Sequence, residues 1–210
     1  MSPLLEALKW RYATKKFDAE RTLSDDKITV IKEAFNLTAS SFGLQPVRLL
    51  VVQDQKIQDE LVALSMNQQQ VADASHVLVF CIEKNIDASY IEAYFKNVQE
   101  TRKTPDEILA PFRDYLYSHF ESETSDNITS WATKQAYLAM GNLLTVCALE
   151  KIDACPMEGF DPVGYDTLFN LEEKGLSSVL VMPIGYRAED DMFSEFKKVR
   201  KTLQDAIIEI

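Results

Sequence analysis

The sequence predicts an α+β fold in which helices outnumber strands. Three short apolar runs, rich in β-branched residues, indicate strands at 47–52, 76–82 and 177–184, and the run 76–82 indicates a fully buried one. A much longer segment, 128–149, is apolar on nearly all sides and indicates a central, buried helix. No Pro/Gly/Ser-rich or low-complexity stretch divides the 210 residues. The sequence therefore predicts a single domain spanning residues 1–210.

Capping residues and breakers set the boundaries of the other helices. Ser2-Pro3 supplies an N-cap and a proline at the first helical position, which predicts a helix reaching about Tyr12. Ser24 is a cap with acids after it and predicts a helix over 24–37. The region 88–121 is helical in pattern but broken at Pro105. A short helix is also expected at 57–66.

The chain ends on an apolar run, Ala206-Ile207-Ile208-Glu209-Ile210. This composition predicts a short strand. Because β-branched apolar residues at a free terminus would be unusual, we expect the tail to dock on another surface.

Composition excludes several classes of protein. A formal net charge of −11 argues against a nucleic-acid partner, which would require a broad basic surface. No stretch approaches the roughly 18 apolar residues of a membrane helix, and the N-terminal residues do not have the pattern of a secretory signal. Three cysteines without metal-ligand spacing fit reduced thiols in a cytoplasmic protein, with no metal site.

Familiar catalytic signatures are missing. The glycines form neither a GxGxxG fingerprint nor a P-loop, and no HExxH occurs. Of the two histidines, His76 opens a buried strand and is expected to be a satisfied structural residue, whereas His119 lies on a polar helix and is expected to be exposed. If the protein is an enzyme, a bound organic cofactor is expected to carry the chemistry.

Cations gather near both ends of this acidic chain. Arg11 and Lys15 lie in one short run, and Lys198 and Arg200 lie in another. Guanidinium and ammonium groups in such runs are suited to a small anion, with phosphate as the natural candidate. The alternative is that both runs are solvated basic patches, and spacing alone does not exclude it.

Several motifs follow one another along nearly the whole chain: Leu8-Lys9-Trp10-Arg11-Tyr12-Ala13-Thr14-Lys15-Lys16-Phe17-Asp18, Thr38-Ala39-Ser40-Ser41-Phe42-Gly43-Leu44-Gln45-Pro46, Asn67, Asp73–Cys81, Trp131–Leu138, Gly141-Asn142, Pro156-Met157-Glu158-Gly159-Phe160-Asp161 and Lys198-Val199-Arg200. In this order and spacing they resemble the FMN-dependent nitroreductase family, particularly its oxygen-insensitive nitroreductase and dihydropteridine reductase branch.

The resemblance implies a central mixed sheet flanked by helices, in an intertwined homodimer whose C-terminal tail docks on the partner. It implies an FMN-dependent oxidoreductase that takes hydride from NADH or NADPH in a ping-pong cycle. The implied partner is a small-molecule electron acceptor, either a nitroaromatic, a quinone or a pterin. Flavin N5 would carry the hydride, so no catalytic side chain is implied.

The resemblance also assigns cofactor contacts. Arg11, Lys15, Lys198 and Arg200 would hold the FMN phosphate and the polar edge of the flavin. Ser40, Ser41 and Phe42 would line the ring from the partner subunit. The remaining implied contacts are Tyr12, Ala13, Gln45, Asn67, Gln70, Pro156, Met157, Glu158 and Gly159. Among them, Gln45 and Asn67 would bond ribityl or ring atoms, and a backbone N–H of 156–159 would reach N5.

Three positions depart from the family pattern. Ala13 stands where Ser is usual, Gln70 where Lys or Arg is frequent, and Val47 where Trp often follows Gln-Pro. Alternatives also stay open at this stage. The segment 156–159 also fits an ordinary turn, and the chain also fits a flavin-binding protein with little turnover or a structural dimer without flavin.

Overall fold

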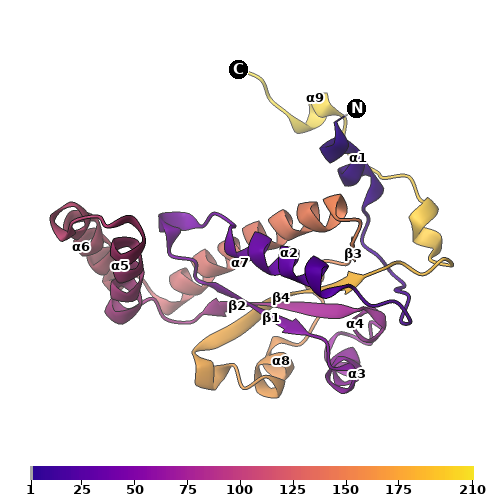
Figure 1. The fold of residues 1–210 in the computed structure, drawn as a ribbon, viewed down its shortest axis with the longest axis horizontal. Helices are drawn as coiled ribbons and strands as arrows, with labels where there is room; N and C mark the ends of the chain where they lie inside the picture. The colour runs from indigo at the N-terminus through magenta and orange to yellow at the C-terminus, as the bar shows by residue number, and fades with distance from the viewer. Residues whose placement is uncertain (1) are drawn as a thin grey trace.

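The computed structural model describes residues 2–210, and its centre is a four-stranded antiparallel sheet (Figure 1). The strand order is β1-β2-β4-β3, and every neighbouring pair is antiparallel. The strands are β1 Val47–Val52, β2 His76–Glu83, β3 Asp153–Ala154 and β4 Leu176–Gly185. The α+β class is as expected, but the pairing of these strands is not mixed. Parallel pairing among the described residues is confined to one isolated bridge between Ala13 and Ala154. An apolar pattern indicates that a strand is buried, but it does not indicate whether the neighbouring strands are parallel or antiparallel to it.

Helices surround this sheet. The α-helices are α1 Pro3–Trp10, α2 Asp25–Asn36, α3 Gln55–Leu64, α4 Gln70–Asp73, α5 Ala88–Arg102, α6 Asp106–Ser122, α7 Ser125–Leu149, α8 Pro162–Leu168 and α9 Leu203–Ala206. Three short 3₁₀ turns complete the described elements: η1 Ser41–Gly43, η2 Glu172–Lys174 and η3 Met192–Glu195. Within residues 2–210, no helix has both the length and the apolar composition that crossing a bilayer requires.

The sheet is covered on both faces, and β2 is buried along its entire length. Because successive side chains of a strand point to opposite faces, β2 contributes alternately to two cores. Leu78, Phe80 and Ile82 pack with α2 and α7, whereas Val77 and Val79 pack with α3 and α8. His76, at the start of β2, is buried and shares a 2.8 Å hydrogen bond with the Ser75 hydroxyl. It is the satisfied structural histidine that the sequence predicts.

Helices α5 and α6 form a hairpin that projects from the body (Figure 1). The helical region breaks where expected, because Pro105 is the N-cap of α6. The hairpin carries its own apolar cluster, which also includes Phe42 and Trp131. His119 is not exposed as the sequence predicts: it is half-buried, stacked on Tyr115 and edge-on to Phe42. The Phe42 ring that covers His119 comes from η1, which is distant in sequence.

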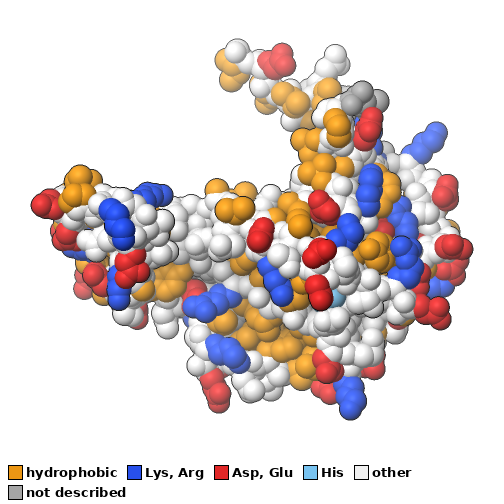
Figure 2. All heavy atoms as spheres, viewed as in Figure 1, with side chains coloured by type: hydrophobic (Ala, Val, Ile, Leu, Met, Phe, Trp, Pro, Cys, Tyr) orange, Lys and Arg blue, Asp and Glu red, His pale blue; other side chains and the backbone are white. Residues whose placement is uncertain are grey.

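The C-terminal tail leaves the body beside α1, so the two ends of the chain lie close together (Figure 1). The expected strand at 206–210 is wrong for this single chain, because 203–206 is helix α9 and 207–210 makes no sheet pairing with any described residue. Thr202 caps α9 through the Asp205 N–H. A strand requires a hydrogen-bonded neighbour, and the tail has none here. Apolar side chains of α1 and the tail are exposed and group together (Figure 2): Leu4, Leu5, Leu8, Leu203, Ile207, Ile208 and Ile210.

Candidate functional site

The first run of cations lies in the extended segment 11–17 that follows α1. This segment is attached to the end of the sheet, where Thr14 N–H donates to the Ala154 carbonyl at 3.3 Å and Ala13 forms its bridge to Ala154. A second bridge joins Phe17 to Arg187, just after β4. Burial raises the pKa of Cys155, while the neighbouring charges of Lys15 and Arg11 oppose that shift. Arg11 and Lys15 therefore both lie close to Cys155, the residue immediately before Pro156.

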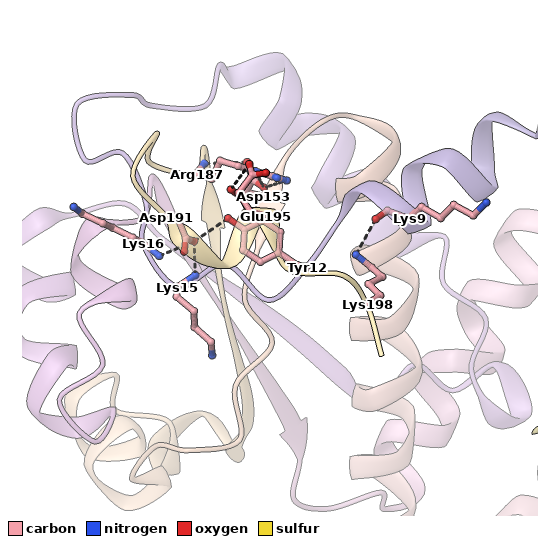
Figure 3. Close-up of polar contacts among 10 residues, drawn as sticks. Lys9, Tyr12, Lys15, Lys16, Asp153, Arg187, Asp191, Glu195 and Lys198 are labelled. Carbon is pink, nitrogen blue, oxygen red and sulfur yellow. Dashed lines mark hydrogen bonds and ion pairs between the residues drawn. The ribbon is translucent and has the colours of Figure 1, made fainter. Parts of the chain in front are cut away.

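The second run of cations reaches the same place. The Lys198 ammonium donates a 2.8 Å hydrogen bond to the Lys9 carbonyl, in the last turn of α1 (Figure 3). Burial lowers the pKa of Lys198, and the charges of Arg11, Arg200 and Arg187 lower it further. Burial and then Arg200 likewise lower the pKa of Arg11. The structure thus brings Arg11, Lys198 and Arg200 together from opposite ends of the chain.

These three cations are not neutralised. Among residues 2–210, no carboxylate lies within ion-pair distance of Arg11, Lys198 or Arg200. In a chain with net charge −11, such a cluster is not explained by a shortage of acidic groups. Its like charges repel one another in the absence of an anion. The cluster is therefore suited to a phosphate.

A network that sequence reasoning missed supports this cluster (Figure 3). Asp191 is buried and accepts a 2.8 Å hydrogen bond from the Tyr12 hydroxyl. Arg187 donates to Asp153 through Nε at 2.7 Å, and its guanidinium lies 4.5 Å from the Tyr12 ring centre. The only signal for these residues in the sequence is a polar group after an apolar strand, which is too common to identify a site.

Loop 156–159 begins next to the cations. Met157 N–H donates to the Val181 carbonyl at 2.8 Å and Val181 N–H donates back at 3.1 Å, so the loop is hydrogen-bonded to β4. The N–H groups of Glu158 and Gly159 have no acceptor among the described residues. Glu158 is exposed and Gly159 is partly exposed, so both donors are open to solvent and could bind a ligand acceptor.

A hollow of about 470 Å³ separates this loop from α7. Its lining consists of Tyr137, Met140, Gly141, Leu144, Pro156, Met157, Glu158 and Leu180. Gly141 is in the interior of α7, yet a Cβ there would meet no atom within 4 Å. Glycine in a helix interior costs about 1 kcal/mol relative to alanine. Since packing within this chain does not require Gly141, the open space is suited to a ligand or another chain.

Asn67 and Gln70 lie on either side of Gln68, which contacts the same loop. Asn67 has φ 57° in the turn after α3, and the adjacent Gln68 side chain donates to the Gly159 carbonyl at 3.0 Å. Gln70, in α4, is 8% exposed, and its side-chain amide has no hydrogen-bond partner among residues 2–210. The amide is nonetheless not enclosed, because its polar atoms still reach solvent. It remains available for a polar group of a ligand.

The other expected contacts lie elsewhere in this chain. Ser41 N–H donates to the Gln135 side chain at 2.8 Å, and Gln45 N–H donates to the Ser40 hydroxyl at 3.0 Å. Phe42, at φ 58°, packs among the aromatic rings of the hairpin and Trp131. Residues two apart in a helix do not face each other, so Gln135 and Tyr137 point to different sides of α7. One chain therefore presents Ser40–Gln45 and loop 156–159 on different sides of the same helix.

Comparison with known proteins agrees with this geometry. The model of the family described as Nitroreductase family matches residues 8–186. A protein of Staphylococcus saprophyticus, whose name proposes an NAD(P)H nitroreductase, is 32% identical over 98% of this chain and 95% of its own length. A Bacillus subtilis structure whose name proposes a nitroreductase has a TM-score of 0.89 at 18% identity, covering all of both chains.

A third similar protein, from Exiguobacterium sibiricum, is also given a nitroreductase name and was solved in complex with FMN. Its structure has a TM-score of 0.84 at 21% identity and covers 99% of this chain and 97% of its own. At these identities the solved structures establish the fold, and the family model and the staphylococcal relative establish membership. The chain belongs to the nitroreductase family.

Proposed function

We propose that this protein is an FMN-dependent oxidoreductase that uses NADH or NADPH to reduce a small, electron-poor acceptor. Nitroaromatics, quinones and pterin-like compounds are the proposed acceptor classes. The observation that carries the proposal is the unneutralised cluster of Arg11, Lys198 and Arg200 beside a loop with two free backbone donors. Bound FMN would supply the hydride chemistry, accepting hydride from the nicotinamide and passing it to the acceptor in a ping-pong cycle.

The cations would hold the phosphate end. A guanidinium can donate to two phosphate oxygens at once, while Lys198 supplies a point charge. Lys198 is already bound to the Lys9 carbonyl, so its ammonium is partly fixed before a ligand arrives. Lys15, on the Cys155 side of the cluster, would face the polar edge of the flavin. A cation there favours the anionic, reduced form.

Loop 156–159 would lie against the ring. Pro156 and Met157 offer an apolar surface, and the free N–H groups of Glu158 and Gly159 offer donors to ring acceptors such as N5. One oxygen of the Glu158 carboxylate already accepts a 2.7 Å hydrogen bond from the Tyr137 hydroxyl. We assign no side chain as a proton donor, because water can supply protons to an open pocket. Asn67 and Gln70 would bond polar atoms of the ring or the ribityl chain.

The complete site would require two subunits. Ser40, Ser41, Phe42 and Gln45 lie on a different side of α7 from loop 156–159, so the contacts they make would be to the flavin of a second copy. The exposed apolar tail fits the same homodimer. β1 is the edge strand of the sheet, and the tail of a second copy could extend the sheet there. An interface above about 2,000 Å² is expected for such an obligate dimer.

Residues 1–210 would act as one FMN-binding domain, since the cation cluster draws on both ends of the chain. The three cysteines are unpaired and buried, which fits a cytoplasmic location for the protein. Relative to the family pattern, Ala13 lacks a hydroxyl, Gln70 lacks a positive charge and Val47 lacks an indole ring. We expect these changes to affect affinity and acceptor range while leaving the binding mode intact.

An absorption spectrum of the purified protein tests the proposal. We expect the bands of oxidised flavin, bleached by NADH or NADPH under anaerobic conditions and restored by a quinone or nitroaromatic. A flavin spectrum that neither reductant bleaches would indicate a flavin-binding protein without turnover. If the protein takes up no FMN even after titration with excess cofactor, the proposed function is wrong.

A further inference from the structure

Asp191 lies beside Tyr12, Lys15 and Lys16, where segment 11–17 meets the chain that follows β4 (Figure 3). It follows β4 in the chain and is 3% exposed, which is unusual for a carboxylate. Burial alone would raise the pKa of Asp191, but the hydrogen bonds from Tyr12, Lys15, Lys16 and Phe193 outweigh it, and the pKa is lowered. The carboxylate is therefore ionised and fully engaged in the folded protein.

The two oxygens of Asp191 serve two different segments. Oδ2 accepts from the Tyr12 hydroxyl at 2.8 Å and from the backbone N–H groups of Lys15 at 3.0 Å and Lys16 at 3.1 Å. Oδ1 accepts from the Phe193 N–H at 3.1 Å and so caps η3. One carboxylate thus joins the segment that carries Arg11 and Lys15 to the segment that leads to Lys198 and Arg200.

Other contacts join the same two segments independently of Asp191. Ala188 N–H donates to the Lys16 carbonyl at 3.0 Å, and Asp18 N–H donates to the Tyr186 carbonyl at 2.9 Å. Arg187 lies between two aromatic rings, 4.3 Å from the centre of Trp10 and 4.5 Å from that of Tyr12. These contacts keep the two segments adjacent, so loss of the Asp191 charge would alter their alignment without separating them.

Asp191 does not neutralise the neighbouring cations, because of the kind of donors that it bonds. It bonds backbone N–H groups and a phenol, and it forms no ion pair with Lys15, Arg11, Lys198 or Arg200. A carboxylate bonded to those ammonium or guanidinium groups would cancel the charge that an anion needs. Asp191 instead accepts hydrogen bonds from the backbone of the segment that carries Arg11 and Lys15. The positive charge of these side chains therefore remains available to an anion.

We infer that Asp191 is a positioning residue that aligns the two cationic segments of the cofactor site for the phosphate. It acts through the backbone of 12–16 and through η3 without touching the cofactor. This role rests on the proposed function and extends it to a residue outside the expected set of contacts. If Asp191 has this role, its loss should weaken binding of ligands that carry a phosphate more than binding of ligands that lack one, because the aligned cations would contact the phosphate.

The test compares FMN with riboflavin, which has the same ring and ribityl chain but no phosphate. Dissociation constants would be measured by quenching of flavin fluorescence with the apoprotein of wild type, Asp191→Asn and Asp190→Asn. Asp190 is the matched control, because it is exposed and, among residues 2–210, its side chain pairs only with that of Lys16. We expect Asp191→Asn to weaken FMN binding about tenfold and riboflavin binding no more than about twofold, as for loss of a charge-assisted hydrogen bond. Asp190→Asn should match wild type for both ligands.

The outcomes separate this inference from the proposed function. If wild type binds no FMN, the proposed function fails. If wild type binds FMN but Asp191→Asn binds it equally well, or loses FMN and riboflavin affinity to the same extent, the positioning role is wrong. Should Asp191→Asn fail to fold, Tyr12→Phe removes one of the Oδ2 hydrogen bonds and decides the matter. Its FMN-to-riboflavin affinity ratio should fall about threefold or more, and an unchanged ratio would overturn the inference.

Discussion

The Tyr137 hydroxyl, on α7, donates a 2.7 Å hydrogen bond to the Glu158 carboxylate, on the loop that follows β3. This bond raises the pKa of Tyr137. It holds the carboxylate toward α7, while the backbone N–H of Glu158 has no acceptor among the described residues.

We predict that Glu158→Gln lowers turnover by less than about 10-fold, below the 10²–10⁴-fold typical of a lost general acid. Steady-state oxidation of NADH with a quinone, at saturating FMN, measures it. Tyr137→Phe keeps the carboxylate but removes its partner, and it should be similarly mild. A loss of about 100-fold or more in Glu158→Gln with FMN bound would make Glu158 an acid catalyst.

Replacing Arg200 or Arg11 with alanine should weaken FMN binding by roughly 1.5–3 kcal/mol, or about 10- to 100-fold, because each would remove a charge-assisted contact to phosphate. Fluorescence titration of the apoprotein gives the dissociation constants. Arg102→Ala is the control, since Arg102 is an exposed arginine on the projecting hairpin. If Arg200→Ala retains wild-type affinity, Arg200 belongs to the solvated surface.

The tail should hold a homodimer together. Wild type should scatter light with twice the 23.9 kDa mass of the chain. The double variant Ile207→Asp/Ile208→Asp should raise the dimer dissociation constant more than about 100-fold, because each buried isoleucine contributes about 1.5–3 kcal/mol. Val163→Asp, at an exposed position on α8, should leave the mass unchanged. A wild-type monomer at micromolar concentration with FMN bound would contradict the two-subunit site.

Asp191 should make stability depend on pH in the acid range. Its pKa is lower in the folded protein, so its contribution is complete above the ordinary carboxyl pKa of about 3.9 and is lost as pH falls through the folded-state value. Urea unfolding of wild type and Asp191→Asn at pH 7, 5, 4 and 3 measures this. Wild type should be more stable at pH 7 and 5, and the difference should shrink at pH 3. A difference that stays constant over this range would exclude the ionised carboxylate as its source.

Local signals predicted much of the fold. The N-caps Ser2, Ser24 and Pro105 and the strand 47–52 lie where the residues indicate, because caps and apolar runs act over a few neighbours. Helix α3 starts and stops earlier than the expected 57–66. Asp54 caps it, and Met66 and Asn67 adopt left-handed conformations after its end.

What the sequence did not predict depends on contacts between distant residues. The antiparallel pairing, the burial of His119 under Phe42 and the conformation of the tail are set by segments far apart in the chain. The same holds within the site. Arg11 and Lys198 were identified from their charge, whereas Asp191 and Arg187 resemble many other surface residues until the fold brings them to segment 11–17.

The hydrogen bond from Lys198 to the Lys9 carbonyl joins residues 189 positions apart. During synthesis, the segment bearing Arg11 leaves the ribosome long before Lys198 and Arg200 are made. All four strands and α7 precede Lys198 in the chain, whereas the cation cluster requires residues from both ends. If the proposed site is right, its phosphate end is completed only by the last residues to be made, and we expect a chain truncated before residue 198 to lack two of the three cations that would hold the phosphate.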